Sequence, residues 1–154
     1  NTLTINGERH LVESNAPITR TFESKKQKGA EVDLSTVFAN SVKKAVRTVI
    51  LDQKDHLEVI DRLETRDKEA TVSWIMVTPA EAKITGKNRI ELTKDGQRML
   101  LTADTGTEVE MKIWSNVPPH EYDFRNPGTI RVGFETVIPA NRASQLKVRL
   151  IPLK

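Results

Sequence analysis

The sequence predicts an all-β fold, an antiparallel β-sandwich of about a dozen short strands with little helix. Apolar and polar residues alternate with period two in run after run, as expected of strands that bury one face. Asn-Gly and Asp-Gly pairs and scattered prolines separate these runs at short, regular intervals. Together these observations indicate two antiparallel sheets packed face to face.

Alternation is clearest near the C-terminus. In residues 145–150 the side chains of Leu146, Val148 and Leu150 point one way, and the two basic residues between them point the other. Residues 129–136, 107–113 and 2–5 repeat the pattern. Residues 71–77 and 46–51 are apolar at most positions, which predicts strands buried on both faces. We expect a core that includes Trp74, Met76, Val132, Phe134, Val148 and Leu150.

Two turns predict hairpins. Asn6-Gly7 separates residues 2–5 from residues 8–12, and Asp95-Gly96 separates residues 90–92 from residues 99–102. Both central residues of such a turn need positive φ, which Asn, Asp and Gly tolerate. Residues 34–44 can form one or two helical turns with Asp33 or Ser35 as the N-cap. No other segment favours a helix.

Composition restricts the classes of function. The chain has 154 residues, which suits a single domain over residues 1–154, and it lacks cysteine, which excludes disulfides and thiolate metal sites. No apolar run approaches the roughly 20 residues of a membrane helix, so we expect no membrane span. The formal charge of +3 permits an acidic partner, but no basic motif indicates nucleic-acid binding. Lys25, Lys26 and Lys28 are interpreted as part of a solvated loop.

Several short segments, taken in order, resemble the heparinase II/III family of bacterial polysaccharide lyases. Residues 1–9 resemble the family's His-Asn-Thr strand and the polar-Gly turn after it, and residues 32–35 resemble its Val-Asp-Leu-Thr segment. Residues 42–49 resemble a strand in which a valine is followed by basic residues, and residues 59–63 resemble a strand with an Asp followed by a charged residue. Residues 74–78 resemble a strand that contains Trp, so the resemblance covers about the first 80 residues.

The resemblance implies a fold, an activity and partners. Family members combine an N-terminal helical toroid with C-terminal antiparallel sheets, and they cleave acidic polysaccharides by β-elimination. It implies that this chain, which begins with Asn1, is the C-terminal fragment of a larger secreted or periplasmic bacterial lyase. Its partners would be an acidic polysaccharide and the helical domain. Because the toroid and the family's His before Asn1 are absent from the sequence, we expect the fragment alone to be inactive.

Carbohydrate contact is the site hypothesis. His120 and Tyr122 share one face of an extended segment, with Arg125 close by. Trp114 ends a predicted strand and enters a loop, where an aromatic ring can stack on a sugar face. The competing interpretation, which we weigh more heavily, is a solvated loop with no ligand.

The other candidate residues receive structural interpretations. His10 would lie on a hairpin strand and His56 at a strand edge, and the wide separation of the three histidines predicts no metal and no cofactor. Arg47 and Asp61 are expected to form a buried or half-buried ion pair on neighbouring strands. The exterior Arg131, Lys147 and Arg149 could form a basic sheet face, although surface solubility explains these charges adequately.

Two alternatives to the lyase domain stay open. The chain can be a free-standing carbohydrate-binding module, or a purely structural or adhesive sandwich. The polysaccharide, its sulfation and the oligomeric state cannot be derived from the sequence.

Overall fold

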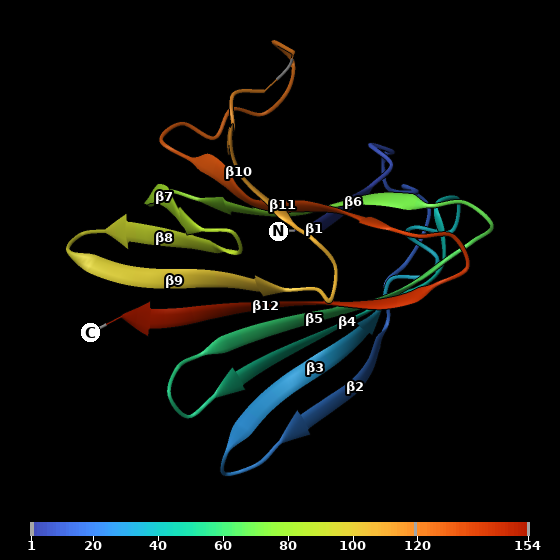
Figure 1. Cartoon of the computed structure of the whole chain (residues 1–154), viewed down its shortest axis with the longest axis horizontal. Coiled ribbons are helices and arrows are strands. Elements are labelled where there is room, and N and C mark those ends of the chain that lie inside the picture. Colours follow the sequence, from blue (N-terminus) through green and yellow to red (C-terminus); the bar gives the residue numbers. More distant parts are fainter. Residues whose placement is uncertain (1, 119, 154) are drawn as a thin grey trace.

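The computed structural model describes residues 2–118 and 120–153, which leaves Asn1, Pro119 and Lys154 outside the description. It confirms the predicted fold class: the described residues form twelve strands and no helix (Figure 1). In chain order the strands are β1 Thr2–Ile5, β2 Ile18–Glu23, β3 Gln27–Asp33, β4 Val42–Asp52, β5 Leu57–Thr65, β6 Ala70–Thr78, β7 Glu81–Gly86, β8 Arg89–Lys94, β9 Gln97–Asp104, β10 Glu110–Ser115, β11 Ile130–Ile138 and β12 Ala143–Leu153.

Two antiparallel sheets form the sandwich. The four-stranded sheet has the order β1-β6-β11-β10, and the eight-stranded sheet has the order β2-β3-β4-β5-β12-β9-β8-β7. Figure 1 shows that the eight-stranded sheet fans out. Its strands β2 to β5, residues 18–65, here called the wing, spread away from the four-stranded sheet. Within the wing, β4 and β5 still supply core residues, among them Ala45, Val59 and Leu63, whereas β2 and β3 contain no buried residue.

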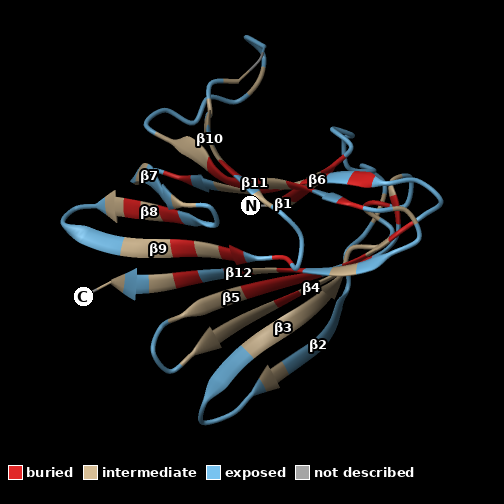
Figure 2. Ribbon diagram, in the orientation of Figure 1, coloured by how far each residue is buried: buried red, intermediate tan, exposed pale blue. Residues whose placement is uncertain are grey.

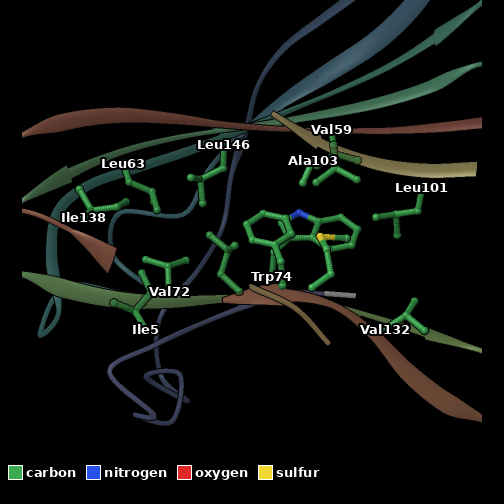
Figure 3. Packing of buried hydrophobic residues seen from close by; sticks show 14 of the residues in the cluster. Ile5, Val59, Leu63, Val72, Trp74, Leu101, Ala103, Val132, Ile138 and Leu146 are labelled. Atoms are coloured by element: carbon green, nitrogen blue, oxygen red, sulfur yellow. The ribbon is translucent and has the colours of Figure 1, made fainter. Parts of the chain in front are cut away.

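The core lies between the sheets (Figure 2). Phe134 on β11 pairs with Trp74 on β6, and their rings stack almost parallel with centroids 6.2 Å apart. Figure 3 shows Val59, Ala103 and Leu146 of the large sheet on the side that faces Trp74. Of the predicted core residues, the structure confirms all but one as buried; Met76 is half-buried and packs against the core.

Gly133 lets β11 approach β6 closely. Its φ is +158°, and a Cβ built there would lie 1.8 Å from the Trp74 carbonyl oxygen. Only glycine fits such a close backbone approach, which places the Phe134 ring beside Trp74.

One hairpin prediction is confirmed and one is wrong. Asp95-Gly96 connects β8 to β9 as expected. Asn6-Gly7 does form a turn with positive φ, but residues 8–12 form no strand. The turn instead attaches β1 to β6, because the Asn6 N–H donates to the Thr71 carbonyl and the Asn6 side-chain oxygen accepts from the Thr71 N–H. This pairing buries Leu3 and Ile5, which a two-stranded hairpin would leave exposed.

The strands predicted to be buried on both faces have one exposed or half-exposed face. In β4 the apolar residues 46 and 49–51 are only half-buried, because β4 belongs to the wing. In β6 the outward-facing Thr71 and Val77 are exposed. The strand expected over residues 107–113 begins at Glu110, and its Ile113 is 39% exposed because β10 is an edge strand. Residues 34–41 form turns, with the Asp33 carboxylate accepting from the Ser35 N–H.

Candidate functional site

The connection between β10 and β11, residues 116–129, projects beyond the sheets (Figure 1). Hydrogen bonds of Asn116 and Thr129 join the two ends of this loop, here called its neck. The Asn116 amide donates to the Thr129 hydroxyl at 2.7 Å, and that hydroxyl donates to the Asn126 carbonyl at 2.7 Å. Gly128, with φ at +71°, turns the chain back toward β11. The loop is therefore tied at its base while its tip extends into solvent.

Aromatic residues occupy the tip. The rings of His120 and Tyr122 stack with centroids 4.9 Å apart and an interplanar angle of 12°. This contact brings residues 120 and 122 together as predicted, but through a turn and not through the extended segment that was expected, because the Asp123 N–H donates to the His120 carbonyl at 3.2 Å. Tyr122 is 83% exposed, so its ring is available to a ligand on the side away from His120.

His120 and Arg125 line the same hollow. This open depression of about 500 Å³ sits inside the loop and is lined by Asn116, Val117, Pro118, His120, Glu121, Arg125, Asn126, Pro127, Gly128 and Thr129. Tyr122 lies outside the lining but contacts it through the His120 ring. Three of the four predicted site residues thus come together in one loop.

Trp114 does not join them. The inward positions of β10 are Met111 and Ile113, so Trp114 projects from the outer face of the four-stranded sheet, with Arg131 as its cross-strand neighbour. The Arg131 guanidinium donates to the Ser115 carbonyl at 3.0 Å, which holds it at the start of the loop. Trp114 is half-buried there and borders the loop without lining its hollow.

Sequence reasoning missed Phe124, which is 86% exposed. No periodic signal identifies Phe124, because residues 120–123 form a turn and not the extended segment on which alternation depends. Val117, 77% exposed, adds another apolar side chain to the loop. Exposed apolar side chains gathered in one loop are a common mark of a contact surface.

The loop carries a formal charge of −1. Glu121 and Asp123 are acidic, and Arg125 is the single basic residue besides neutral His120. Attraction of an anionic ligand by net charge is therefore not a property of this loop. Its chemistry favours stacking on an apolar ligand face, with Arg125 as one local hydrogen-bond donor.

The remaining histidines serve the fold. The His10 Nε2–H donates to the Leu3 carbonyl at 2.9 Å, and its ring packs edge-on against Phe38. His10 lies on a loop, so the hairpin strand predicted for it is wrong. His56 Nδ1 lies 3.2 Å from an Asp52 oxygen within the β4–β5 turn. Among the described residues no three His, Cys, Asp or Glu side chains are grouped so as to hold a metal.

The predicted ion pair between Arg47 and Asp61 is confirmed. The guanidinium contacts both carboxylate oxygens, at 2.7 and 2.9 Å, and the Asp61 side chain is 1% exposed. Burial raises the pKa of Asp61, and the bonds from Arg47 oppose that rise. The Trp74 indole N–H lies close enough to lower this pKa slightly, yet it has no acceptor in hydrogen-bonding geometry. This group pins β4 to β5 inside the sandwich.

The predicted basic sheet face is wrong. Lys147 and Arg149 both approach the Glu58 carboxylate, at 3.7 and 2.7 Å, so their charge is shared with an acid. Arg131 lies in the other sheet. Alternation correctly gave the outward direction of each side chain, but it could not show which strands are neighbours.

Comparison with solved structures identifies the fold. A crystal structure of heparinase III aligns over 99% of this chain with a TM-score of 0.77 and 14% identity. A second heparinase III aligns over 100% with a TM-score of 0.74 and 14% identity. The heparan sulfate lyase HepC from Pedobacter heparinus aligns over 99% with a TM-score of 0.68 and 17% identity. The chain shares its fold with part of heparinase III.

The chain spans about a quarter of the length of these proteins: 23% of both heparinase III chains and 24% of HepC. No protein-family model matches the sequence, and no curated protein matches it. Within the described residues there is no helix with the length and apolar character needed to span a membrane.

Proposed function

We propose that the chain is the C-terminal β-sandwich domain of a heparinase II/III-type polysaccharide lyase. The observation that carries the proposal is the alignment of practically the whole chain with heparinase III and with heparan sulfate lyase HepC. The ordered segments of residues 1–80 that resemble the family support it independently. In this proposal the parent protein is secreted or periplasmic in a bacterium, its substrate is an acidic polysaccharide, and its N-terminal helical domain packs beside this one.

The domain supports catalysis without performing it. β-Elimination from a uronide needs a base for the C5 proton, a group that neutralises the carboxylate, and an acid for the leaving oxygen. His10 and His56 are engaged with the backbone and with Asp52, and His120 is stacked on Tyr122. His120 and Arg125 do line one hollow, but it is an open depression in an exposed loop, so it does not shield a reacting sugar from water. We infer that the catalytic base, the neutralising group and the acid come from the rest of the parent protein.

Sugar contact is the role we assign to the 116–129 loop. Tyr122 and Phe124 present exposed rings, and Arg125 and His120 line the hollow beside them. A pyranose has an apolar face that stacks on such rings and hydroxyl groups that accept from a guanidinium. Trp114 can extend the contact along the sheet edge.

An activity assay tests the absence of catalysis. The isolated chain, incubated with heparan-type and other uronic-acid polysaccharides, should generate no ultraviolet absorbance of unsaturated uronides. Growth of that absorbance, abolished by Tyr122→Phe or His120→Ala, would overturn the supporting role and make the stacked pair catalytic.

A binding titration tests the sugar contact and the alternative. Heparan-type oligosaccharide should bind weakly, and Tyr122→Ala or Phe124→Ala should weaken it further, with Val137→Ala on the sheet as an exposed apolar control. The loop's net negative charge favours one competing function, a free-standing carbohydrate-binding module. Salt-insensitive binding to a neutral glycan, lost in Trp114→Ala, would establish that module in place of the lyase domain.

A further inference from the structure

Two hairpin turns meet at the outer end of the wing. The β2–β3 turn comprises residues 24–26 and the β4–β5 turn residues 53–56. The Gln53 N–H donates to the Lys26 carbonyl at 3.2 Å, which joins one turn to the other. Figure 1 shows this end of the wing on the opposite side of the molecule from the 116–129 loop.

Each turn is held by its own side-chain cap. The Ser24 hydroxyl accepts from the N–H groups of Lys26 and Gln27, both at 3.2 Å. One Asp52 oxygen accepts from the N–H groups of Lys54 and His56, at 2.7 and 3.0 Å. The backbone that carries the turn residues is therefore ordered before any ligand arrives, which reduces the entropy lost on binding.

Four lysines converge at this end: Lys25, Lys26, Lys28 and Lys54, here called the lysine tip. All four are exposed, and none makes a salt bridge with any residue the structure describes. Elsewhere among the described residues, Lys43, Lys94, Lys112 and Lys147 each lie within 4 Å of a carboxylate, whereas Lys44, Lys68, Lys83 and Lys87 make no salt bridge. The tip is therefore distinguished by four lysines on two joined turns and not by the lack of salt bridges alone.

Three acidic residues share this end, and they leave the lysines in excess. Asp52 directs its oxygens to the turn backbone and to the His56 ring. Glu23 lies across from Lys28 in the β2–β3 register, and Asp55 occupies the positive-φ position of its turn. Lys25, Lys26 and Lys54 are exposed on the two turns, and Lys54 also acts on Asp52, where its charge is one of the smaller causes that lower the pKa of that carboxyl. Four lysines against three acids leave a formal excess of one positive charge at this end.

We propose that the lysine tip binds sulfate or carboxylate groups of an acidic polysaccharide. The proposal rests on the proposed function, and it supplies the cationic contact that the 116–129 loop lacks. Lysine ammonium groups on flexible stems suit a polymer whose anions are irregularly spaced, because no fixed bidentate geometry is required. Binding at the tip is electrostatic, so it weakens steeply as salt rises.

The test compares two triple variants of equal charge. The first is Lys25→Gln, Lys26→Gln and Lys54→Gln, and the second is Lys68→Gln, Lys83→Gln and Lys87→Gln, three exposed lysines outside the tip. Each is titrated with heparin at low and high salt after its unfolding transition has been shown to match the wild type. The tip variant should bind about tenfold more weakly at low salt, the control within about twofold of wild type, and the difference should vanish at high salt.

Several outcomes overturn the assignment. Equal weakening in both triple variants would show that net charge alone drives binding, and absence of heparin binding at low salt would remove the site. Equally tight binding of DNA with the same response to the tip substitutions would make the tip a general polyanion contact instead of a glycan site. A failure of the sugar contact proposed for the 116–129 loop gives a different result. In that case Tyr122→Ala and Phe124→Ala leave oligosaccharide binding unchanged, while the tip variant still binds heparin more weakly.

Discussion

The seam between the two sheets and the 116–129 loop contain the same kinds of side chain in opposite surroundings. In the seam, Phe134 is fully buried and stacks on Trp74, and the Arg47 guanidinium bonds to the buried Asp61 carboxylate. In the loop, Phe124 is 86% exposed, and Tyr122 stacks only on His120. Aromatic rings in the seam stabilise the sandwich, whereas those in the loop remain available for an external ligand.

Residue type alone therefore does not decide whether an aromatic side chain in this chain is structural or available to a ligand. Phe134 is structural because it lies in a strand whose inward-facing neighbours Val132 and Thr136 are also buried. Tyr122 and Phe124 are candidate contacts because they lie together in an exposed loop. Matched substitutions in the two regions can therefore test whether burial decides the role of an aromatic side chain.

The largest effect is expected from truncating the two phenylalanines. Phe134→Ala should lower the free energy of unfolding by about 3–5 kcal/mol, because it leaves a cavity beside Trp74. Phe124→Ala, the same change in the loop, should stay within about 0.5 kcal/mol of wild type. Urea denaturation measures both. A Phe134→Ala loss below about 1 kcal/mol would show that the seam is not tightly packed.

The seam was predictable from the sequence because burial leaves a periodic pattern. Alternation in residues 129–136 and 145–150 predicted the inward faces correctly, and the resemblance of two neighbouring strands to the heparinase II/III family predicted the pairing of Arg47 with Asp61. Strand neighbours were less predictable. Asn6-Gly7 has the local chemistry of a hairpin, yet tertiary pairing with β6 buries more apolar surface than residues 8–12 could.

The second effect concerns the buried ion pair. Arg47→Met should lower stability at pH 7 by about 3 kcal/mol, because it leaves the Asp61 carboxylate buried without its partner. Removing the guanidinium raises the pKa of Asp61 further. A raised folded-state pKa gives stability that is present at low pH and lost as pH rises through it, so the deficit should shrink on acidification.

Denaturation of Arg47→Met across a pH series checks this prediction. Arg62→Met is the control. Arg62 follows Asp61 on β5 and therefore lies on the opposite face of the sheet, where its exposed side chain donates to the Thr48 hydroxyl. Its effect should be smaller and nearly independent of pH. A constant deficit in Arg47→Met from acid to neutral pH would mean that Asp61 does not change its protonation state.

Two glycine substitutions distinguish the cost of a steric clash between strands from the smaller cost of a strained φ angle. Gly133→Ala forces a Cβ against the Trp74 carbonyl and should cost about 1–3 kcal/mol. Gly128→Ala in the loop has positive φ but no neighbour within 4 Å, so only about 1 kcal/mol of backbone strain is expected. Thermal unfolding of the two variants shows which substitution destabilises the protein more. Equal losses would show that the β11–β6 approach adapts easily.

The candidate site was only partly predictable. His120, Tyr122 and Arg125 were found from their spacing, and the structure places them in one loop. Trp114 was expected with them because it ends a strand, but the pleat turns it onto the outer sheet face. The lysine tip depends on Gln53 meeting Lys26, a contact between residues far apart in sequence that no local pattern encodes.

The smallest expected effect on stability lies at the neck of the loop. Thr129→Val keeps the side-chain shape but removes the hydroxyl that donates to the Asn126 carbonyl and accepts from Asn116. An exposed hydrogen bond contributes little net stability, so unfolding should change by about 1 kcal/mol or less. The loop should nevertheless become more mobile, because its two ends lose their connection, and hydrogen exchange at residues 120–126 should accelerate.

Oligosaccharide binding should weaken more than stability does, because a loosened loop must be ordered again when the sugar arrives. Thr129→Ser, which keeps the hydroxyl, should restore both exchange protection and binding. If Thr129→Val accelerates exchange yet binds sugar as the wild type does, the loop does not contribute to recognition. If neither property changes, the two neck hydrogen bonds do not hold the loop.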